Sequence, residues 1–256
     1  MAAGSQQRFE GKAAVVTGAG SGIGRAVSLR LAAEGAEVLA TDISAERLGE
    51  TSALAEAAGA KIHTRAGDVS NRTECFAAVE EAVGTFGHLD ILGNVAGIGR
   101  AEHFTEVTEA AYRQMMGVNA DGYFFMAQAA MPHLLESGGA VINIASNAGL
   151  MGQAYTVAYC MSKGAVVQLT KSLAMEYAKT NVRVNAIAPG GTATNLTGAF
   201  SFPPEGIDFK LVMRYTGQRP MAQPEDIASL FAFLASDEAA NIHGAIVSSD
   251  GGLTAG

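Results

Sequence analysis

Along the chain, short runs rich in β-branched residues alternate with longer alanine-rich stretches whose apolar positions recur with helical spacing. The short runs predict buried strands at 13–17, 37–41, 62–66, 89–94, 140–145, 182–188 and 245–249. The longer stretches predict helices at 22–34, 45–58, 72–86, 109–135, 155–178 and 224–235. Strands that alternate with helices of this length are typical of βαβ units. We therefore expect an α/β fold, a doubly wound parallel sheet of about seven strands with helices on both faces.

Several predicted helices carry recognisable end signals. Gly35, Gly59 and Gly87 each follow a helical stretch, where glycine readily takes the left-handed conformation of a cap, and Thr108 precedes another stretch as an N-cap. No linker-like segment divides the chain, so we expect one domain over residues 1–256. Residues 191–221 show no regular pattern. Irregular segments of that length in a compact domain are usually functional or disordered, and we interpret this one as a mobile substrate lid.

Composition narrows the class of protein. The 256 residues are 48% hydrophobic and 16% charged, with a net charge of −8, which suits a globular domain with a large core. An acidic chain without basic runs is a poor candidate for nucleic-acid or membrane-surface binding. Its polar start and the absence of a long apolar run lead us to expect a cytoplasmic protein. Cys75 and Cys160 have no paired spacing, and the five histidines have no ligand spacing, so we expect no disulfide and no metal.

A glycine-rich turn lies between the first predicted strand and the first predicted helix, where residues 17–24 read TGAGSGIG. Its glycines let the backbone approach a pyrophosphate, and the N-terminus of the following helix offers free N–H groups. A plain tight turn is the alternative, but the strand before and the helix after favour a Rossmann-type dinucleotide site. The expected contacts in this turn are Gly18, Ser21, Gly22, Ile23 and Gly24.

Asp42 closes the second predicted strand and bears on the choice of cofactor. A carboxylate there accepts both hydroxyls of the adenosine ribose and repels a 2′-phosphate. Ser21, Ile23 and Ile43 supply no cation, and Arg25 is expected to point along its helix, away from the ribose. The sequence therefore favours NAD over NADP, with a helix cap as the alternative role for Asp42.

Asp68 and Val69 follow the third predicted strand, at the carboxyl edge where such sheets bind nucleotides. We expect Asp68 to accept a hydrogen bond from the adenine amino group. The alternative is that it caps the helix beginning near Arg72.

Four polar residues indicate the chemistry. Tyr159 and Lys163 stand four apart on one predicted helix, so the phenol and the ammonium share a face and the cation favours the phenolate. Ser146 ends a strand at the same edge of the sheet, where its hydroxyl can donate to a substrate carbonyl while Tyr159 exchanges the proton. Asn119 lies mid-helix beside glycines, and a buried amide there needs a specific polar partner unless it only bonds its own backbone.

Together these motifs resemble the short-chain dehydrogenase/reductase family from about Phe9 to Leu253. The resemblance rests on the TGxxxGxG turn, the YxxxK pair, Ser146, Asn119 and the Pro189-Gly190 pair after a strand. It implies that Tyr159 is the general acid/base, that Ser146 polarises the carbonyl and that Lys163 binds the nicotinamide ribose. It further implies that Asn119 holds a relay water. The same resemblance implies cofactor contacts at Asn94, Ala96, Gly97, Pro189, Gly190, Thr192 and Thr194.

One departure from the family pattern concerns the segment usually written NNAG, which here reads Asn94-Val95-Ala96-Gly97. The missing second amide is thought to stabilise the central strand, so we expect a structural difference there. Thr192 stands where a branched apolar residue is common. Apolar side chains suggest a pocket wall, or alternatively packing of the lid or of a subunit interface; they are Leu150, Met151, Tyr155, Phe200, Phe202, Met213 and Tyr215.

The leading hypothesis is an NAD-dependent oxidoreductase acting on CH–OH groups, which transfers hydride between nicotinamide and a secondary alcohol or ketone with an apolar substrate. A reductase of 3-oxoacyl thioesters, carried on acyl carrier protein or CoA, is the alternative enzyme. A non-catalytic NAD(H)-sensing protein is the alternative from another class. The resemblance also implies a homotetramer, with helices 109–135 and 155–178 pairing across an interface.

Overall fold

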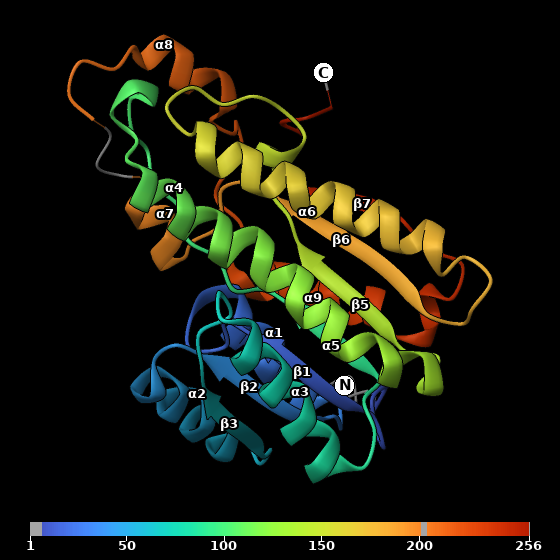
Figure 1. Cartoon of the computed structure of the whole chain (residues 1–256). Helices are drawn as coiled ribbons and strands as arrows, with labels where there is room; N and C mark the ends of the chain where they lie inside the picture. Colours follow the sequence, from blue (N-terminus) through green and yellow to red (C-terminus); the bar gives the residue numbers. More distant parts are fainter. Residues whose placement is uncertain (1–6, 201–203, 256) are drawn as a thin grey trace.

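The computed structural model describes residues 7–200 and 204–255. Within them, seven strands form one parallel sheet in the order β3-β2-β1-β4-β5-β6-β7 (Figure 1). The strands are β1 Ala13–Thr17, β2 Glu37–Asp42, β3 Ile62–Ala66, β4 Ile91–Asn94, β5 Ala140–Ile144, β6 Arg183–Pro189 and β7 Ile246–Ser249. The strand order reverses between β1 and β4, and doubly wound sheets bind ligands outside the carboxyl ends of strands at such a switch point. The predicted fold is confirmed.

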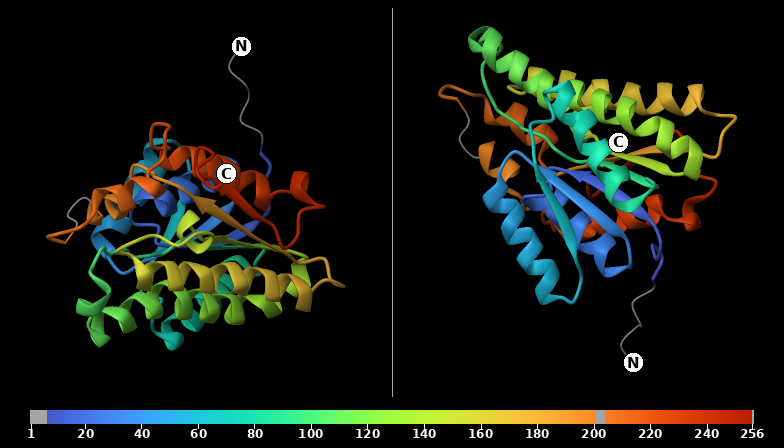
Figure 2. Two further views of the ribbon diagram at one scale, coloured as in Figure 1. Left: turned by 90° about the horizontal axis from the view of Figure 1, so that it is seen from above. Right: turned by 60° about the horizontal axis from the view of Figure 1, so that its bottom comes forward.

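Helices cover both faces of this sheet (Figures 1 and 2). Apolar residues of α1, α2 and α9 pack on one face, and those of α3, α5 and α6 pack on the other. The helices are α1 Gly22–Ala33, α2 Ala45–Ala57, α3 Arg72–Phe86, α4 Glu109–Met116, α5 Gly122–Ser137, α6 Val157–Glu176, α7 Asn195–Ala199, α8 Phe209–Val212 and α9 Pro224–Ala235. Strands enclosed in this way are buried on both sides, which explains why β1 reads as an unbroken apolar run until its final threonine.

The predicted helix ends agree closely with the structure. Gly87 caps α3 in the left-handed conformation, with φ of 84°, and the Thr108 side chain accepts from the backbone N–H of Ala111 at 3.2 Å. The N-cap of α3 is Asn71, whose side chain accepts from the N–H of Thr73 at 2.9 Å. The alternative role of Asp68 as the cap of this helix is therefore wrong.

The predicted helix 109–135 is present as one helical run over residues 109–137, but it contains a π-helical turn. Between α4 and α5, residues 117–121 form a π-helical turn that contains Asn119. At the start of α5, Gly122 lies against the connection between β3 and α3. A Cβ on this glycine would lie 3.0 Å from the carbonyl oxygen of Val69 in that connection. Side-chain periodicity cannot report such a turn, because the sequence on either side keeps the same helical spacing.

The region 191–221, which shows no regular sequence pattern, contains short helices. Its described part holds α7, α8 and a 3₁₀ turn at Met213–Tyr215. Thr194 caps α7 by accepting from the N–H of Thr197. The predicted wall residue Phe202 lies outside the described residues.

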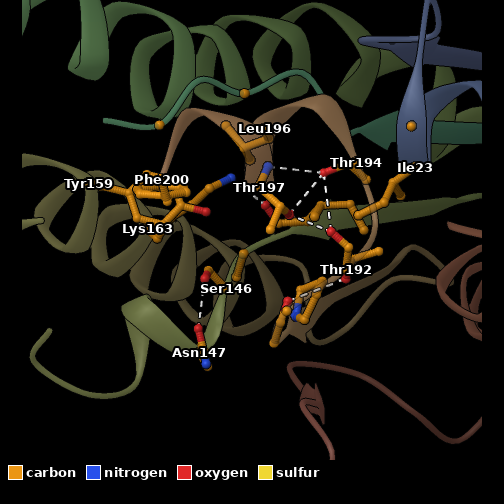
Figure 3. A pocket seen from close by; sticks show the side chains of 18 of the residues that line it. Ile23, Ser146, Asn147, Tyr159, Lys163, Thr192, Thr194, Leu196, Thr197 and Phe200 are labelled. Carbon is orange, nitrogen blue, oxygen red and sulfur yellow. Dashed lines mark hydrogen bonds between the residues drawn. The ribbon is translucent and has the colours of Figure 1, made fainter. Parts of the chain in front are cut away.

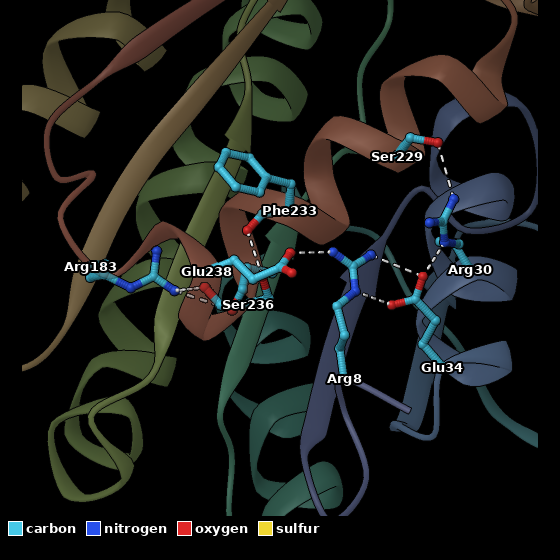
Figure 4. Close-up of polar contacts among 9 residues, drawn as sticks. Arg8, Arg30, Glu34, Arg183, Ser229, Phe233, Ser236 and Glu238 are labelled. Carbon is cyan, nitrogen blue, oxygen red and sulfur yellow. Dashed lines mark hydrogen bonds and ion pairs between the residues drawn. The ribbon is translucent and has the colours of Figure 1, made fainter. Parts of the chain in front are cut away.

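An ion-pair cluster connects Arg8 with the end of α1 and with the 3₁₀ turn Asp237–Ala239 that follows α9 (Figure 4). The guanidinium of Arg8 contacts Glu34 at 2.6 Å and Glu238 at 3.0 Å. Arg30 also pairs with Glu34 and donates to the hydroxyl of Ser229 at 3.0 Å. Burial alone raises the pKa of Glu34, but the hydrogen bonds from Arg8 and Arg30 outweigh it and lower the pKa.

Among the described residues, no helix combines the length and apolar character that crossing a bilayer requires.

Candidate active site

A cavity of about 1440 Å³ opens at the carboxyl ends of the strands. Single small-molecule pockets are typically roughly 300–1000 Å³, so this cavity has room for a dinucleotide and a substrate together. Most of the residues predicted for the site line it. They are Gly18, Ser21, Gly22, Ile23, Gly24, Asp42, Asp68, Val69, Ala96, Gly97, Ser146, Tyr159, Lys163, Pro189, Gly190, Thr192 and Thr194. In the described part of the chain, the two predicted residues that do not line it are Asn94 and Asn119.

The glycine-rich turn is shaped by close backbone contacts. Gly18 has φ of 67°, and a Cβ there would lie 2.7 Å from the Cα of Ala96. A Cβ on Gly24 would lie 2.1 Å from the carbonyl oxygen of Gly18. Ser21, the N-cap of α1, makes no side-chain cap bond within the described residues. The helix N-terminus therefore presents uncapped N–H groups at the cavity, and this arrangement fits a pyrophosphate.

The carboxylate of Asp42 is fixed at one end of the cavity. Its two oxygens accept from the backbone N–H groups of Gly20 and Ser44, each at 3.0 Å. The side chain of Ser44 caps α2 by accepting from the N–H of Arg47. Asp42 is therefore not the cap residue of α2, and its position suits the ribose contact expected from the sequence.

Two arginines lie near this end. In the described chain Arg25 does not line the cavity, but it reaches across to α2 and does not point along its own helix as expected: it donates to the Thr51 hydroxyl at 3.0 Å and to the Gly20 carbonyl at 2.5 Å. It also pairs with Glu50 at 2.6 Å. Arg47 also lines the cavity, and no sequence motif indicates it. A Cβ on Gly20 would lie within 2.9 Å of both the Asp42 and Arg47 side chains, so this glycine brings them against the turn.

Asp68 lies at the cavity edge next to Val69, after β3. One of its oxygens accepts from the N–H and the hydroxyl of Ser70, at 2.9 and 2.8 Å. The Asp68 N–H donates to Glu74 at 2.5 Å. The carboxylate is thus held by its own turn, with lone pairs remaining for a ligand.

Asn94 takes a structural position. It is buried, and its amide donates to the side-chain oxygen of Asn143 at 3.0 Å and to the carbonyl of Tyr123 at 3.3 Å. It therefore joins β4 to β5. Next to it, Val95 replaces the family's second amide, and the hydroxyl of Thr17 accepts from the N–H groups of both Val95 and Ala96.

Three of the four catalytic candidates meet in the cavity (Figure 3). Tyr159 and Lys163 come from α6, and Ser146 follows β5. The ammonium of Lys163 donates to the carbonyl of Ile144 at 2.8 Å and to the phenol oxygen of Tyr123 at 3.3 Å. Tyr123, on α5, was missed in the sequence, although it stands one helical turn after Asn119 and shares its face.

Burial controls the protonation of the Tyr–Lys pair. It raises the pKa of Tyr159 to about 12, against an opposing hydrogen bond from Ser146. It lowers the pKa of Lys163 to about 7. The sequence predicts that Lys163 together with an oxidised nicotinamide lowers the tyrosine pKa, whereas in the protein alone desolvation is the largest effect on Tyr159 and raises its pKa. A productive proton exchange at neutral pH therefore needs further positive charge beside the phenol.

Asn119 lies behind the cavity wall, fully buried. Its oxygen accepts from the N–H of Ile98 at 2.8 Å, and its amide donates to the Ile98 carbonyl at 2.8 Å and to the Ser162 hydroxyl at 3.0 Å. These are specific polar partners, so the alternative that it bonds its own backbone is wrong. A Cβ on Gly97 would lie 3.4 Å from the Asn119 oxygen and 3.6 Å from the Lys163 nitrogen, so the glycine keeps space between them.

The substrate end of the cavity is largely apolar. The ring of Phe200 stands edge-on to Tyr159, with centroids 5.4 Å apart. Of the expected wall residues, Phe200, Tyr155 and Tyr215 line the cavity in the described chain, whereas Leu150, Met151 and Met213 do not. Leu196, Ile207 and Val212 complete this wall. Two amides, Asn147 and Gln153, also line it and carried no sequence signal.

Comparison with known proteins places the whole chain among enzymes. Residues 18–254 match the family model described as enoyl-(acyl carrier protein) reductase. The chain is 37% identical to meso-2,3-butanediol dehydrogenase of Serratia marcescens, over 97% of its length and 96% of the relative's. It is 36% identical to a 3-oxoacyl-[acyl-carrier-protein] reductase of Thermotoga maritima, over 96% of its length and 99% of the relative's.

Solved structures agree with these matches. A short chain dehydrogenase from Mycobacterium paratuberculosis bound to NAD has a TM-score of 0.91 and 32% identity, covering 97% of this chain and 100% of that one. The similarity therefore extends over the sheet, the glycine-rich turn and the catalytic helix.

Proposed function

The chain belongs to the short-chain dehydrogenase/reductase family, and from this premise we propose that it interconverts a secondary alcohol and a ketone with NAD as cofactor. The observation that carries the proposal is one continuous cavity that holds the phosphate turn and Asp42 together with Ser146, Tyr159 and Lys163. The NAD-bound relative supports the choice of cofactor. The apolar wall beside Tyr159 supports an apolar substrate body.

The residues divide the work between binding and proton transfer. A bound NAD⁺ supplies the hydride acceptor and a positive charge beside the phenol. Tyr159 takes the hydroxyl proton of the alcohol in oxidation and returns it in reduction. Ser146 donates to the reacting oxygen, and Lys163 binds the nicotinamide ribose and holds positive charge near Tyr159.

Asn119 serves this centre from behind the wall. It fixes the backbone at Ile98 and, across the space kept by Gly97, holds a water that links Lys163 to solvent as a proton relay. A Gly97→Ala substitution fills this space, so it should slow proton exchange while the fold persists.

The remaining contacts follow the cavity's length. The phosphate turn, Ser21 and Ile23 included, binds the pyrophosphate, and Asp42 binds the adenosine ribose. Asp68 and Val69 contact the adenine. Ala96 and Gly97 flank the adenosine side, and Asn94 acts there indirectly by holding β4. The nicotinamide carboxamide faces Thr192 and Thr194, which follow Pro189-Gly190.

The test is an initial-rate screen with NAD⁺ and NADP⁺ separately against secondary, cyclic and steroidal alcohols, with Tyr159→Phe alongside. Turnover should require NAD⁺ and vanish in Tyr159→Phe, while NADH binding, followed by fluorescence, is retained. Turnover by Tyr159→Phe would contradict the assignment.

The second candidate function is reduction of 3-oxoacyl thioesters, which the Thermotoga relative favours. The carboxylate of Asp42 disfavours NADPH, and the net charge of −8 disfavours an acidic carrier protein. Acetoacetyl thioester reduction that runs faster with NADPH than with NADH would favour this candidate. A non-catalytic NAD(H) sensor is disfavoured, because Asn119, Ser146, Tyr159 and Lys163 are all present.

Residues 191–221 serve as a mobile lid on a single domain that comprises residues 1–256. Phe200 covers Tyr159, and contacts beside the cavity hold the segment: Tyr155 accepts from the N–H of Asp208, and Tyr215 donates to the carbonyl of Ala154, both at 2.8 Å. Limited proteolysis should cut this segment more slowly when NADH is present.

A homotetramer in the cytoplasm completes the proposal. Helices α5 and α6 lie side by side on one face (Figures 1 and 2). They expose Phe124, Leu135, Met161 and Met175, which a partner's helices would cover. Light scattering should give four times the mass of the chain, and a monomer mass would contradict the assembly. Cell fractionation tests the location.

A further inference from the structure

Next to Ser146, polar side chains form a row along the otherwise apolar substrate wall. The Ser146 hydroxyl donates to the side-chain oxygen of Asn147 at 3.1 Å, as Figure 3 shows. The amide of Gln153 donates to the same oxygen, also at 3.1 Å. Asn147 is 7% exposed, and all three residues line the cavity.

The row has hydrogen-bonding capacity to spare. Within the described residues, no protein group bonds the amide nitrogen of Asn147 or the amide oxygen of Gln153. Figure 3 shows the Asn147 nitrogen turned away from Ser146. Two residues that line the cavity beside the catalytic serine thus carry one open donor and one open acceptor. A hydroxyl group, which both donates and accepts, complements such a pair.

We propose that Asn147 and Gln153 bind a second oxygen of the substrate, on the carbon next to the reacting one. The substrate class is then a vicinal diol, and its product is an α-hydroxyketone. The inference rests on the proposed dehydrogenase function and names the substrate of that same site. The similarity to a butanediol dehydrogenase, whose named substrate is a vicinal diol, supports it.

The adjacency of the second oxygen follows from the row itself. Ser146 has a single hydroxyl proton, which it shares between the Asn147 oxygen and the phenol oxygen of Tyr159. The serine must release Asn147 in order to donate to the reacting oxygen. The Asn147 oxygen then keeps the hydrogen bond from Gln153, and a hydroxyl on the neighbouring carbon reaches the open Asn147 nitrogen and the open Gln153 oxygen beside the serine. A mono-alcohol leaves the Asn147 nitrogen and the Gln153 oxygen without that partner.

The experiment compares pairs of alcohols that differ only in the second hydroxyl: 2,3-butanediol with 2-butanol, and 1,2-cyclohexanediol with cyclohexanol. With NAD⁺, kcat/KM should favour the diol of each pair by about tenfold or more, because a site with buried polar groups rejects the analogue that leaves them unpaired. Gln153→Met keeps the side-chain length and removes both polar atoms, so it should reduce this ratio several-fold. Gln128→Met, on the exposed surface of α5, is the matched control and should leave the ratio unchanged.

The outcomes separate the two levels of the proposal. Equal rates for diol and mono-alcohol would overturn the diol assignment and leave the dehydrogenase function standing. A 3-hydroxybutyryl thioester that outpaces the diols would overturn it in favour of oxygens on alternate carbons. No turnover of any alcohol, with NADH still bound, would overturn the dehydrogenase function and the diol assignment with it. The wild-type ratio tests the proposal even if Gln153→Met fails to fold.

Discussion

The ammonium nitrogen of Lys163 lies 3.3 Å from the phenol oxygen of Tyr123 and 5.0 Å from the centre of its ring. Tyr123 is itself buried and donates its proton to the carbonyl of Ile144 at 3.0 Å. The same carbonyl also accepts from Lys163. Lysine, tyrosine and carbonyl thus form a closed triangle that fixes the ammonium beneath the cavity. Both the phenol oxygen and the ring face favour the charged lysine.

Replacing Tyr123 by phenylalanine keeps the ring and removes the oxygen. The Lys163 ammonium then loses one of its acceptors, so the pKa of Lys163 should fall further below its ordinary value. We expect kcat for alcohol oxidation to fall about threefold to tenfold, from one lost charge-assisted hydrogen bond. The limb of the pH–rate profile that reports Lys163 should move to lower pH.

Tyr177→Phe, on the outer end of α6, is the control for this substitution. It should leave the pH–rate profile in place. If Tyr123→Phe lowers only the melting temperature and its profile coincides with that of the wild type, then Tyr123 is a packing residue.

Removing the Ser146 hydroxyl should have two separate effects. Ser146→Ala takes away the donor to the reacting oxygen, and kcat should fall by about 10²–10³, as when one oxyanion donor is lost. Burial raises the pKa of Tyr159, and the Ser146 hydrogen bond opposes that rise. The variant should therefore need a higher pH to form the phenolate, so the rising limb of the oxidation profile moves up.

Ser229→Ala, on the outer surface of α9, is the control for Ser146→Ala, and its pH–rate profile should match that of the wild type. A variant that loses rate with an unmoved limb would show that Ser146 polarises the substrate but does not tune Tyr159.

Lys163 also predicts how stability depends on pH. Its pKa is about 7 in the folded protein because of burial, and its ordinary value is 10.5. Between these values the unfolded chain binds one proton more than the folded chain, so the free energy of unfolding rises with pH. The rise amounts to on the order of 5 kcal/mol across this range. Below pH 7 both states are protonated, and the contribution stays constant.

Lys163→Met should lack this rise. Urea unfolding of both proteins at pH 7 and pH 9.5 gives the comparison. Between these two pH values, the free energy of unfolding of the wild type should rise by more than that of Lys163→Met. Parallel pH dependence of the two proteins would mean that Lys163 keeps its proton in the folded state throughout this range.

Much of the fold was predictable because its signals are local. The apolar runs gave strands within a residue or two, as at Ala13–Thr17, and Gly87 and Thr108 marked helix ends through their own backbone preferences. The π-helical turn around Asn119 was not predictable. It depends on where Ile98 and Ser162 lie in space, and no spacing along the helix encodes their positions.

The site divides in the same way. The phosphate turn and the Tyr159–Lys163 pair have fixed spacing, so the sequence names them directly. Tyr123, Arg47 and Gln153 reach the site through the packing of separate elements, and each resembles an ordinary helix or loop residue in the sequence. Desolvation is likewise invisible before folding: burial raises the pKa of Tyr159 in the protein alone, while the predicted lowering depends on Lys163 acting together with a bound oxidised nicotinamide.

Cofactor choice should depend on the balance between Asp42 and Arg47 at one end of the cavity. Asp42→Asn keeps an oxygen for one of the two N–H groups, that of Gly20 or that of Ser44, and removes the charge that repels a 2′-phosphate. Arg47 lines the same end and is then available to pair with that phosphate. The ratio of kcat/KM with NADP⁺ to that with NAD⁺ should rise by about 10- to 100-fold. Adding Arg47→Ala to Asp42→Asn should cancel most of the gain, whereas Arg25→Ala should reduce it less. A ratio that does not change in Asp42→Asn would mean that the carboxylate does not face the ribose.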